Sequence, residues 1–202
     1  MAPAWSLSFW QGWVYCLIFA GSTLAITVYF LRHDPALIER RMKGGARAEK
    51  EPTQRTILAW MSILTILLLL FPGFDHRFGW SHIPTSVVIL ADAIVAVGFA
   101  IVFLTFKANS YASAIIEVKP DQTVASHGPY AIVRHPMYAG ATLVLLATPI
   151  ALGSAWAVML ALGIVGGIIW RLLDEERFLS QNLPGYREYC DKTRYRLAPY
   201  VW

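Results

Sequence analysis

The residues best suited to chemistry lie in one short stretch, at positions 127–140, which reads HGPYAIVRHPMYAG. At its centre, Arg134 and His135 precede Pro136. Because proline has a fixed φ and no N–H, it fits the first position of a helix and drives the preceding residue out of helical geometry. We therefore expect a helix that begins at Pro136 and offers unpaired N–H groups to an anion. The alternative is an interfacial cap with a snorkelling arginine.

A second charged group follows the last apolar segment, where positions 170–177 read WRLLDEER. Arg171 and Glu175 are four positions apart and therefore share one face of the predicted helix. An ion pair at a helix end is the simplest structural explanation. However, three acidic residues in the C-terminal half of a helix oppose its dipole and contribute little to topology, so we expect a role for them in a site.

The composition is typical of a membrane protein, since 56% of the 202 residues are hydrophobic and only 15% are charged. Soluble domains carry about 25% charged residues, and a helix needs about 20 mostly apolar residues to cross a bilayer. We predict an all-α, polytopic integral membrane protein with about five transmembrane helices. The predicted spans are Phe9–Leu31, Ile57–Phe74, Val87–Phe106, Met137–Leu152 and Trp156–Leu173.

The distribution of basic residues predicts the topology. Of the 17 lysines and arginines, all except Arg77 lie in or beside loops that five alternating spans would place on one side of the membrane. The positive-inside rule then puts the N-terminus outside and the C-terminus in the cytoplasm, of either a bacterial-type inner membrane or the endoplasmic reticulum. This bias explains the basic charge without a nucleic-acid partner.

The chain divides into two parts in this prediction. Residues 1–107 comprise three transmembrane helices and a basic cytoplasmic loop, which holds a short amphipathic helix at Pro35–Met42 and then a flexible link. Residues 108–202 comprise a cytoplasmic connector, a helical hairpin that turns at Gly153-Ser154, and an aromatic and basic tail. By itself, the tail is typical of an interfacial anchor.

Three features within the predicted spans have structural explanations. Pro72-Gly73 marks the end of the second span. Asp92 is an intramembrane carboxylate and hence a functional candidate, but its position near the outer end of its span favours a hydrated or hydrogen-bonded structural role. Glycines in the fifth span favour close helix packing over a phosphate-binding loop, which would need a preceding strand. These glycines are Gly163, Gly166 and Gly167.

The two cysteines exclude two further classes of protein. Cys16 lies within the first predicted span and Cys190 in the cytoplasmic tail, so they are not placed to pair. Neither has the sequence spacing of a metal ligand. We therefore expect neither a disulfide framework nor a bound metal.

Taken together, the two charged groups and the tail resemble isoprenylcysteine carboxyl methyltransferases, and related membrane phospholipid methyltransferases share parts of the pattern. The resemblance rests on RHPMYAG at 134–140, on Arg171 with Glu175-Glu176, and on the tail. It extends from about Asn109 to the C-terminus, whereas the first three spans are similar only in character. The tail residues that carry it are Tyr186, Tyr189, Arg196 and Pro199.

The resemblance implies that S-adenosylmethionine binds at the cytoplasmic face, between the connector, the start of the fourth span and the end of the fifth. It implies that Arg171 faces the substrate and that Glu175 holds the amino or ribose end of the cofactor, so both belong to the catalytic site. Eukaryotic members carry a polar residue where this chain has Ile115, so Ile115 is not among the predicted cofactor-binding residues. The predicted cofactor-binding residues are Gln122, Thr123, Val124, Ala125, Tyr130, Arg134, His135, Pro136, Met137, Tyr138, Glu175 and Glu176.

The chemistry of methyl transfer is consistent with these roles. The methyl group leaves a sulfonium by in-line displacement, so the protein mainly aligns donor and acceptor. A carboxylate acceptor is ionised at neutral pH and needs only an orienting cation, for which the guanidinium of Arg171 is better suited than an ammonium. Arg134 and the helix start could receive the carboxylate of the cofactor, and Tyr130 or Tyr138 could stack on its adenine or approach its sulfonium.

The predicted function is carboxyl O-methylation of an isoprenylcysteine-like or other lipophilic acceptor in the membrane, and three alternatives stay open. N-methylation of a phospholipid amine would need a base such as Glu176 or His127. The end of the chain, with Tyr189-Cys190, is also similar to NADPH-dependent sterol reductases, which are larger and have more spans. A small transporter or scaffold would carry charge through the bilayer, but only Asp92 lies clearly within a span.

Overall fold

The computed structural model describes residues 2–42, 51–112, 118 and 122–202. These residues form helices and no strand, which confirms the prediction of an all-α fold. The predicted link after Met42 falls on residues 43–50, and Ile115 also lies outside the described residues. In chain order, the elements are the 3₁₀ turn η1 (Ala2–Ala4), α1 (Trp10–His33), α2 (Pro35–Met42), α3 (Pro52–Phe78), α4 (Thr85–Ala108), the 3₁₀ turn η2 (Gly128–Ala131), α5 (Pro136–Ala151), α6 (Val158–Asn182) and α7 (Tyr186–Lys192).

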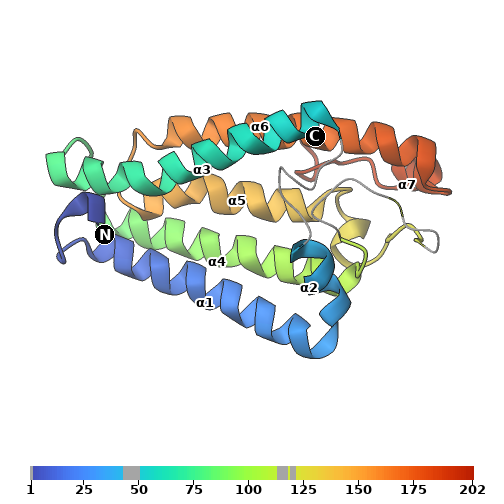
Figure 1. The fold of residues 1–202 in the computed structure, drawn as a ribbon, viewed down its shortest axis with the longest axis horizontal. Coiled ribbons are helices and arrows are strands. Elements are labelled where there is room, and N and C mark those ends of the chain that lie inside the picture. The colour runs from blue at the N-terminus through green and yellow to red at the C-terminus, as the bar shows by residue number, and fades with distance from the viewer. Residues whose placement is uncertain (1, 43–50, 113–117, 119–121) are drawn as a thin grey trace.

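The long helices α1, α3, α4, α5 and α6 run side by side in alternating directions and form the body of the molecule (Figure 1). Helix α5 packs against both α4 and α6, α1 covers α4, and α3 packs along α6. The short elements α2, η2 and α7 gather at one end of this bundle, beside the start of α5 and the end of α6 (Figure 1). The alternating path is the one that the basic residues predict.

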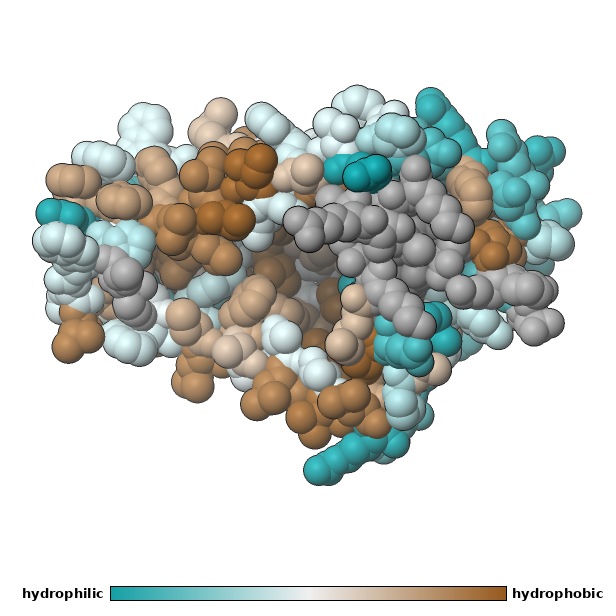
Figure 2. Space-filling view, in the orientation of Figure 1, coloured by the Kyte–Doolittle hydropathy of each residue, from teal (hydrophilic) through white to brown (hydrophobic). Residues whose placement is uncertain are grey.

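The surface and the helix lengths identify an integral membrane protein. Apolar side chains cover the long helices, and hydrophilic side chains gather at the end where α2 and α7 lie (Figure 2). Three helices, α1, α3 and α4, are long and apolar enough to cross a membrane. Helix α5 is apolar but has only 16 residues, or about 24 Å at 1.5 Å per residue, and α6 becomes charged in its C-terminal half. Both complete the bundle that the three spans begin.

The sequence predicts that the second span ends at Pro72-Gly73, and this prediction is wrong. Helix α3 continues to Phe78 and ends at Gly79, which has a φ of +66° and donates its N–H to the carbonyl oxygen of Asp75. A left-handed glycine of this kind is the usual C-terminal stop. Gly73 has a packing role instead, because a Cβ atom there would lie 2.9 Å from the Cβ of Pro3.

Helices α4 and α5 meet backbone to backbone at Gly98 and Gly140. A Cβ atom on Gly98 would lie 2.8 Å from the carbonyl oxygen of Gly140, and a Cβ on Gly140 would lie 2.7 Å from that of Gly98. Backbone atoms cannot move aside as a flexible side chain can, so both positions require glycine. This contact fixes the height of α5 relative to α4, and α5 carries Tyr138.

The glycines of α6 divide into two kinds. A Cβ atom on Gly167 would lie 2.7 Å from the Cγ of Met61, and one on Gly163 would lie 3.0 Å from a methyl group of Leu64, so both allow α6 to pack closely on α3. No described atom lies within 4 Å of a Cβ built on Gly166. The packing prediction is therefore confirmed for Gly163 and Gly167 and is wrong for Gly166.

Two buried aspartates lie toward the end of the bundle that is opposite α2 and α7. Asp75 accepts hydrogen bonds from Ser81 and Ser154 and so links the end of α3 to the predicted hairpin turn, where Gly153 has a φ of +74°. Asp92 is only 4% exposed, and neither of its carboxylate oxygens has a hydrogen-bond partner among the described residues. Within the part of the chain that the structure describes, the hydrogen-bonded role predicted for Asp92 is therefore not observed, and the hydrated role stays a prediction.

Candidate active site

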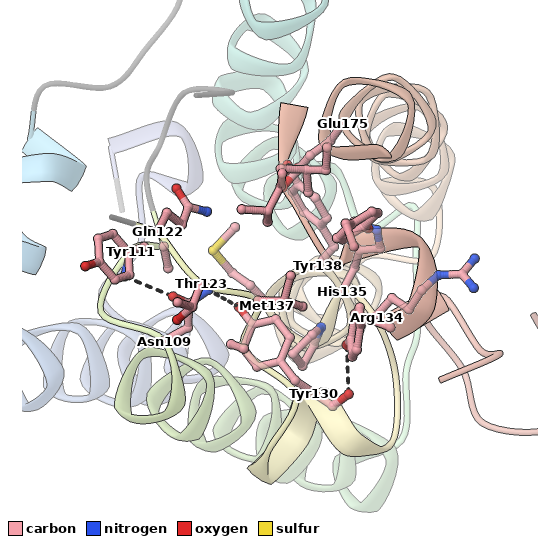
Figure 3. Close-up of a pocket in the computed structure, with 18 residues that line it drawn as sticks. Asn109, Tyr111, Gln122, Thr123, Tyr130, Arg134, His135, Met137, Tyr138 and Glu175 are labelled. Atoms are coloured by element: carbon pink, nitrogen blue, oxygen red, sulfur yellow. Dashed lines mark hydrogen bonds between the residues drawn. The ribbon is translucent and has the colours of Figure 1, made fainter. Parts of the chain in front are cut away.

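A cleft of about 780 Å³, including its open part, lies at the end of the bundle where the connector, α5, α6 and the tail meet (Figure 3). Side chains from segments far apart in the sequence converge on it. The cleft is lined by Asn109, Tyr111, Ala112, Gln122, Thr123, Val124, Ala125, Tyr130, Arg134, His135, Pro136, Met137, Tyr138, Glu175, Leu179, Leu183, Tyr186 and Tyr189.

The helix start predicted at Pro136 is confirmed. His135 occupies the N-cap position with non-helical backbone angles, and Pro136 is the first residue of α5. The tail binds directly to the two residues before the helix: Arg134 donates its backbone N–H to Tyr195 at 2.8 Å, and His135 donates to Arg196 at 3.0 Å. The C-terminal tail therefore packs against the start of α5, beside the cleft.

Glu176 links side chains from the segment just before α5 to the tail. Its Oε1 accepts from Arg134 Nε at 2.6 Å and lies 3.3 Å from His135 Nε2, and its Oε2 accepts from Arg196 Nε at 2.8 Å. Burial alone would raise the pKa of Glu176, but the hydrogen bonds from His135, Arg196 and Arg134 outweigh it and lower the pKa to about 2. Glu176 does not line the cleft, and this ionised carboxylate instead links Arg134, His135 and Arg196 beside it.

A chain of hydrogen bonds connects the cleft to the interior of the bundle. The hydroxyl of Tyr138 donates to Glu175 Oε2 at 2.7 Å, and Arg171 Nε donates to the same hydroxyl oxygen at 3.2 Å. Glu175 and Tyr138 line the cleft, whereas Arg171 is 5% exposed and lies behind them. The structure therefore brings the two predicted catalytic residues together through Tyr138.

Gln54, in the first turn of α3, is a residue of this network that sequence reasoning missed. It is buried, its Oε1 accepts from Arg171 Nη1 at 3.1 Å, and its Nε2 donates to Asp174 Oδ2 at 2.7 Å. One amide thus contacts both the arginine and the acidic group of α6. No local signal marks Gln54, because its partners lie more than a hundred positions away.

Tyrosines form one wall of the cleft, and hydrogen bonds fix their positions. The Tyr130 hydroxyl accepts from Asn109 Nδ2 at 3.2 Å, and the Tyr130 carbonyl oxygen accepts from the Tyr189 hydroxyl at 2.7 Å (Figure 3). Burial raises the pKa of Tyr130 to about 12, so its hydroxyl stays protonated. His127 is exposed and is not among the residues that line the cleft.

Eleven of the twelve predicted cofactor-binding residues line this one cleft, and Glu176 is the exception. Sequence reasoning missed seven other lining residues. A signal existed for three: Leu179 follows Glu175 by four positions and so shares its helix face, and Tyr186 and Tyr189 belong to the tail residues that carry the resemblance. The missed residues are Asn109, Tyr111, Ala112, Leu179, Leu183, Tyr186 and Tyr189.

A comparison with known protein families gave a match to part of the chain. Residues 86–184 match the family described as phospholipid methyltransferase, which is part of the isoprenylcysteine carboxyl methyltransferase-like group. The match begins in α4, earlier than the resemblance noted from the sequence, and includes both charged groups. It ends before α7 and the tail. A search of curated proteins gave no match.

Proposed function

We propose that this chain is a membrane methyltransferase of the phospholipid methyltransferase family, which residues 86–184 match, and that it transfers a methyl group from S-adenosylmethionine to a lipophilic acceptor. The observation that carries this proposal is the convergence of eleven predicted cofactor-binding residues on one cleft. The cleft is built from residues 109–189, which also supports the proposal that 108–202 carries the methyltransferase core.

The cleft residues fit the cofactor chemically. S-adenosylmethionine combines an aromatic adenine, ribose hydroxyls, an ammonium, a carboxylate and a sulfonium that carries the transferable methyl group. Glu175 offers a carboxylate for the ammonium or the ribose, and Tyr130 and Tyr138 offer ring faces to the adenine or the sulfonium. The segment 122–125 would hold the remaining edge of the cofactor.

A groove on the bundle surface supports a lipophilic acceptor. It lies between α3 and α6, measures about 960 Å³ including its open part, and is mostly apolar. Thr53 and Trp170 line it, and they are the sequence neighbours of the buried pair Gln54 and Arg171. An acceptor could therefore keep its apolar tail in this groove while its polar end approaches Arg171. Gly166 faces the groove, which explains why no atom packs against it. The groove is lined by Thr53, Thr56, Ile57, Trp60, Gly163, Gly166, Gly167 and Trp170.

Within this proposal, the acceptor group is a carboxylate, as in an isoprenylcysteine. Arg171 is the guanidinium nearest to the linked Tyr138–Glu175 pair, and it would orient an ionised acceptor that needs no general base. Glu175 would then align the cofactor, and the chain of hydrogen bonds from Glu175 through Tyr138 to Arg171 would keep donor and acceptor in line.

The second candidate acceptor is a phospholipid amine, which the family description favours. An amine must lose its proton before it attacks, so a base is needed. With a pKa of about 2, Glu176 is a weak base, and exposed His127 does not line the cleft. The site therefore favours the carboxylate.

The deciding experiment supplies labelled S-adenosylmethionine to the protein in lipid vesicles, with a farnesylcysteine analogue or phosphatidylethanolamine as acceptor. We expect transfer to the farnesylcysteine analogue at a rate that stays flat from about pH 6 to 9, because its carboxylate is ionised throughout. Transfer only to the amine lipid, with a rate that climbs with pH, would overturn the carboxyl assignment. A rise in melting temperature with NADPH and not with S-adenosylhomocysteine would contradict the cofactor.

A further inference from the structure

Helix α2 is fixed against the wall of the cleft, although it lies outside the matched segment. Leu37 is fully buried in a cluster with Phe30 and Phe106. Arg40 Nη2 donates to the carbonyl oxygen of Ser110 at 2.5 Å, and the Ser110 hydroxyl donates to Asp34 at the start of α2. Because Ser110 lies between two residues that line the cleft, α2 has a defined position beside it.

Arg41 extends from α2 toward the cleft. Its guanidinium carbon lies 4.6 Å from the centre of the Phe106 ring, and its Nη1 donates to Met137 Sδ at 3.3 Å. Met137 lines the cleft, where its side chain lies between Gln122 and Tyr138 (Figure 3). Burial lowers the pKa of Arg41, whereas the charge interactions with Tyr138 and Tyr130 raise it. The guanidinium is therefore close enough to interact electrostatically with these two tyrosines of the cleft.

Within the part of the chain that the structure describes, little of the hydrogen-bonding capacity of Arg41 is used. A guanidinium has five N–H donors, and a thioether sulfur is a weak acceptor. Other arginines near the site have a carboxylate partner: Arg134 pairs with Glu176 and Arg40 with Asp34. Among the described residues, no carboxylate forms a salt bridge with Arg41. A partly buried cation of this kind is suited to bind an anion brought by a ligand.

We propose that Arg41 is an oxyanion-binding residue beside the cleft: its guanidinium, packed on Met137 and Phe106, binds a carboxylate or phosphate of the bound ligand. The proposal rests on the proposed methyltransferase function and adds a site from α2. Arg134, which the sequence places near the cofactor carboxylate, already shares Glu176, so Arg41 is better placed to neutralise a further negative charge. The anion has two possible sources, the amino-acid end of the cofactor and the polar end of the acceptor.

The test compares Arg41→Gln and Arg41→Lys with Lys107→Gln, which removes one positive charge from an exposed position at the same end of the bundle. Calorimetry with S-adenosylhomocysteine measures cofactor affinity, and steady-state kinetics measure KM for the farnesylcysteine analogue. We expect Arg41→Gln to weaken one of these by roughly tenfold to a hundredfold, as for a lost charged hydrogen bond, and Arg41→Lys to recover part of the loss. A weaker Kd identifies the cofactor as the source, and a raised KM identifies the acceptor.

The proposal is overturned if Arg41→Gln has the same Kd and KM as Lys107→Gln at an unchanged melting temperature. A further measurement does not depend on methyl transfer: inorganic phosphate should raise the melting temperature of the wild type more than that of Arg41→Gln. If the wild type binds no S-adenosylhomocysteine but this difference persists, the proposed function fails and the anion site stands. If phosphate raises the melting temperatures of the wild type and of Arg41→Gln equally, the proposed anion site fails as well.

Discussion

Gln54 and Arg171 lie 117 positions apart in the sequence, yet the Arg171 guanidinium donates to the Gln54 amide oxygen across 3.1 Å inside the bundle. The same amide donates to Asp174, so the first turn of α3 fixes both the arginine and the acidic group of α6. Gln54 lies outside residues 86–184, which match the methyltransferase family. The N-terminal helices therefore help to position the residues of the proposed catalytic site.

Replacing Gln54 with leucine should lower turnover while leaving cofactor affinity almost unchanged. Leucine has a similar size but removes the acceptor for a buried N–H of Arg171, which costs about 1–3 kcal/mol, or roughly tenfold to a hundredfold in rate if the arginine moves. Gln181→Leu, at an exposed position near the end of α6, is the matched control. Methyl transfer and binding of S-adenosylhomocysteine are the measurements. Equal turnover in the two variants would show that Gln54 does not position Arg171.

Replacing Arg171 with lysine separates the two acceptor classes. Lysine keeps the charge but cannot donate to the Gln54 oxygen and the Tyr138 hydroxyl in the geometry of a guanidinium. For a carboxylate acceptor we expect a loss of about 3 kcal/mol, or roughly a hundredfold in turnover, with little change in the binding of S-adenosylhomocysteine. A fully active Arg171→Lys enzyme would contradict carboxylate orientation by this residue.

The stabilisation provided by Glu176 should disappear in acid. The folded-state pKa of Glu176 is lowered to about 2, below the ordinary value of about 4.3, so its stabilising effect is complete above that ordinary value and is lost as pH falls toward 2. Relative to Glu176→Gln, we expect on the order of 2 kcal/mol of extra stability at pH 7 and almost none near pH 2. Melting temperatures of both proteins in detergent across this range provide the comparison. A difference that does not depend on pH would contradict the ionised state of Glu176.

An added methyl group should destabilise the protein far more at Gly140, where α5 contacts α4, than at Gly166, which lines the groove between α3 and α6. Gly140→Ala places its Cβ 2.7 Å from the Gly98 carbonyl oxygen and should destabilise the protein by about 1–3 kcal/mol. Gly166→Ala meets no described atom within 4 Å and should be neutral or slightly stabilising, because alanine favours the helix by up to about 1 kcal/mol. Thermal unfolding of both variants tests the pair. Similar melting temperatures would mean that the helices separate more easily than the structure indicates.

The orientation in the membrane is a separate proposal, which rests on the distribution of basic residues. A reporter fused after Trp202 should be cytoplasmic, and one fused to the N-terminus should lie outside. This orientation would place the cleft at the cytoplasmic face, because the cleft lies at the end of the bundle where α2 and α7 gather (Figure 1). Two cytoplasmic ends would require an even number of spans and would exclude the five-span path.

The sequence by itself determined those features that depend on local covalent geometry or on the partition of side chains between water and lipid. The start of α5 at Pro136 follows from the ring of proline, and α2 was predicted with its observed bounds, Pro35–Met42. The apolar segments and the alternating path follow from hydropathy and basic loops. The resemblance to the methyltransferase family also implied eleven of the residues that line the cleft, because they lie in the stretches 122–125, 130–138 and 175 that carry its motifs or adjoin them.

Only the tertiary structure decided how these stretches meet. It showed that Glu176 lies outside the cleft lining, that Arg171 is held by Gln54, and that Arg41 approaches the cleft from α2. It also showed that α3 continues through Pro72. Each of these depends on the rotation and height of one helix relative to another, which backbone contacts such as that between Gly98 and Gly140 fix. Local patterns specify which face of a helix is apolar, but the partner of a single polar side chain depends on packing across the whole bundle.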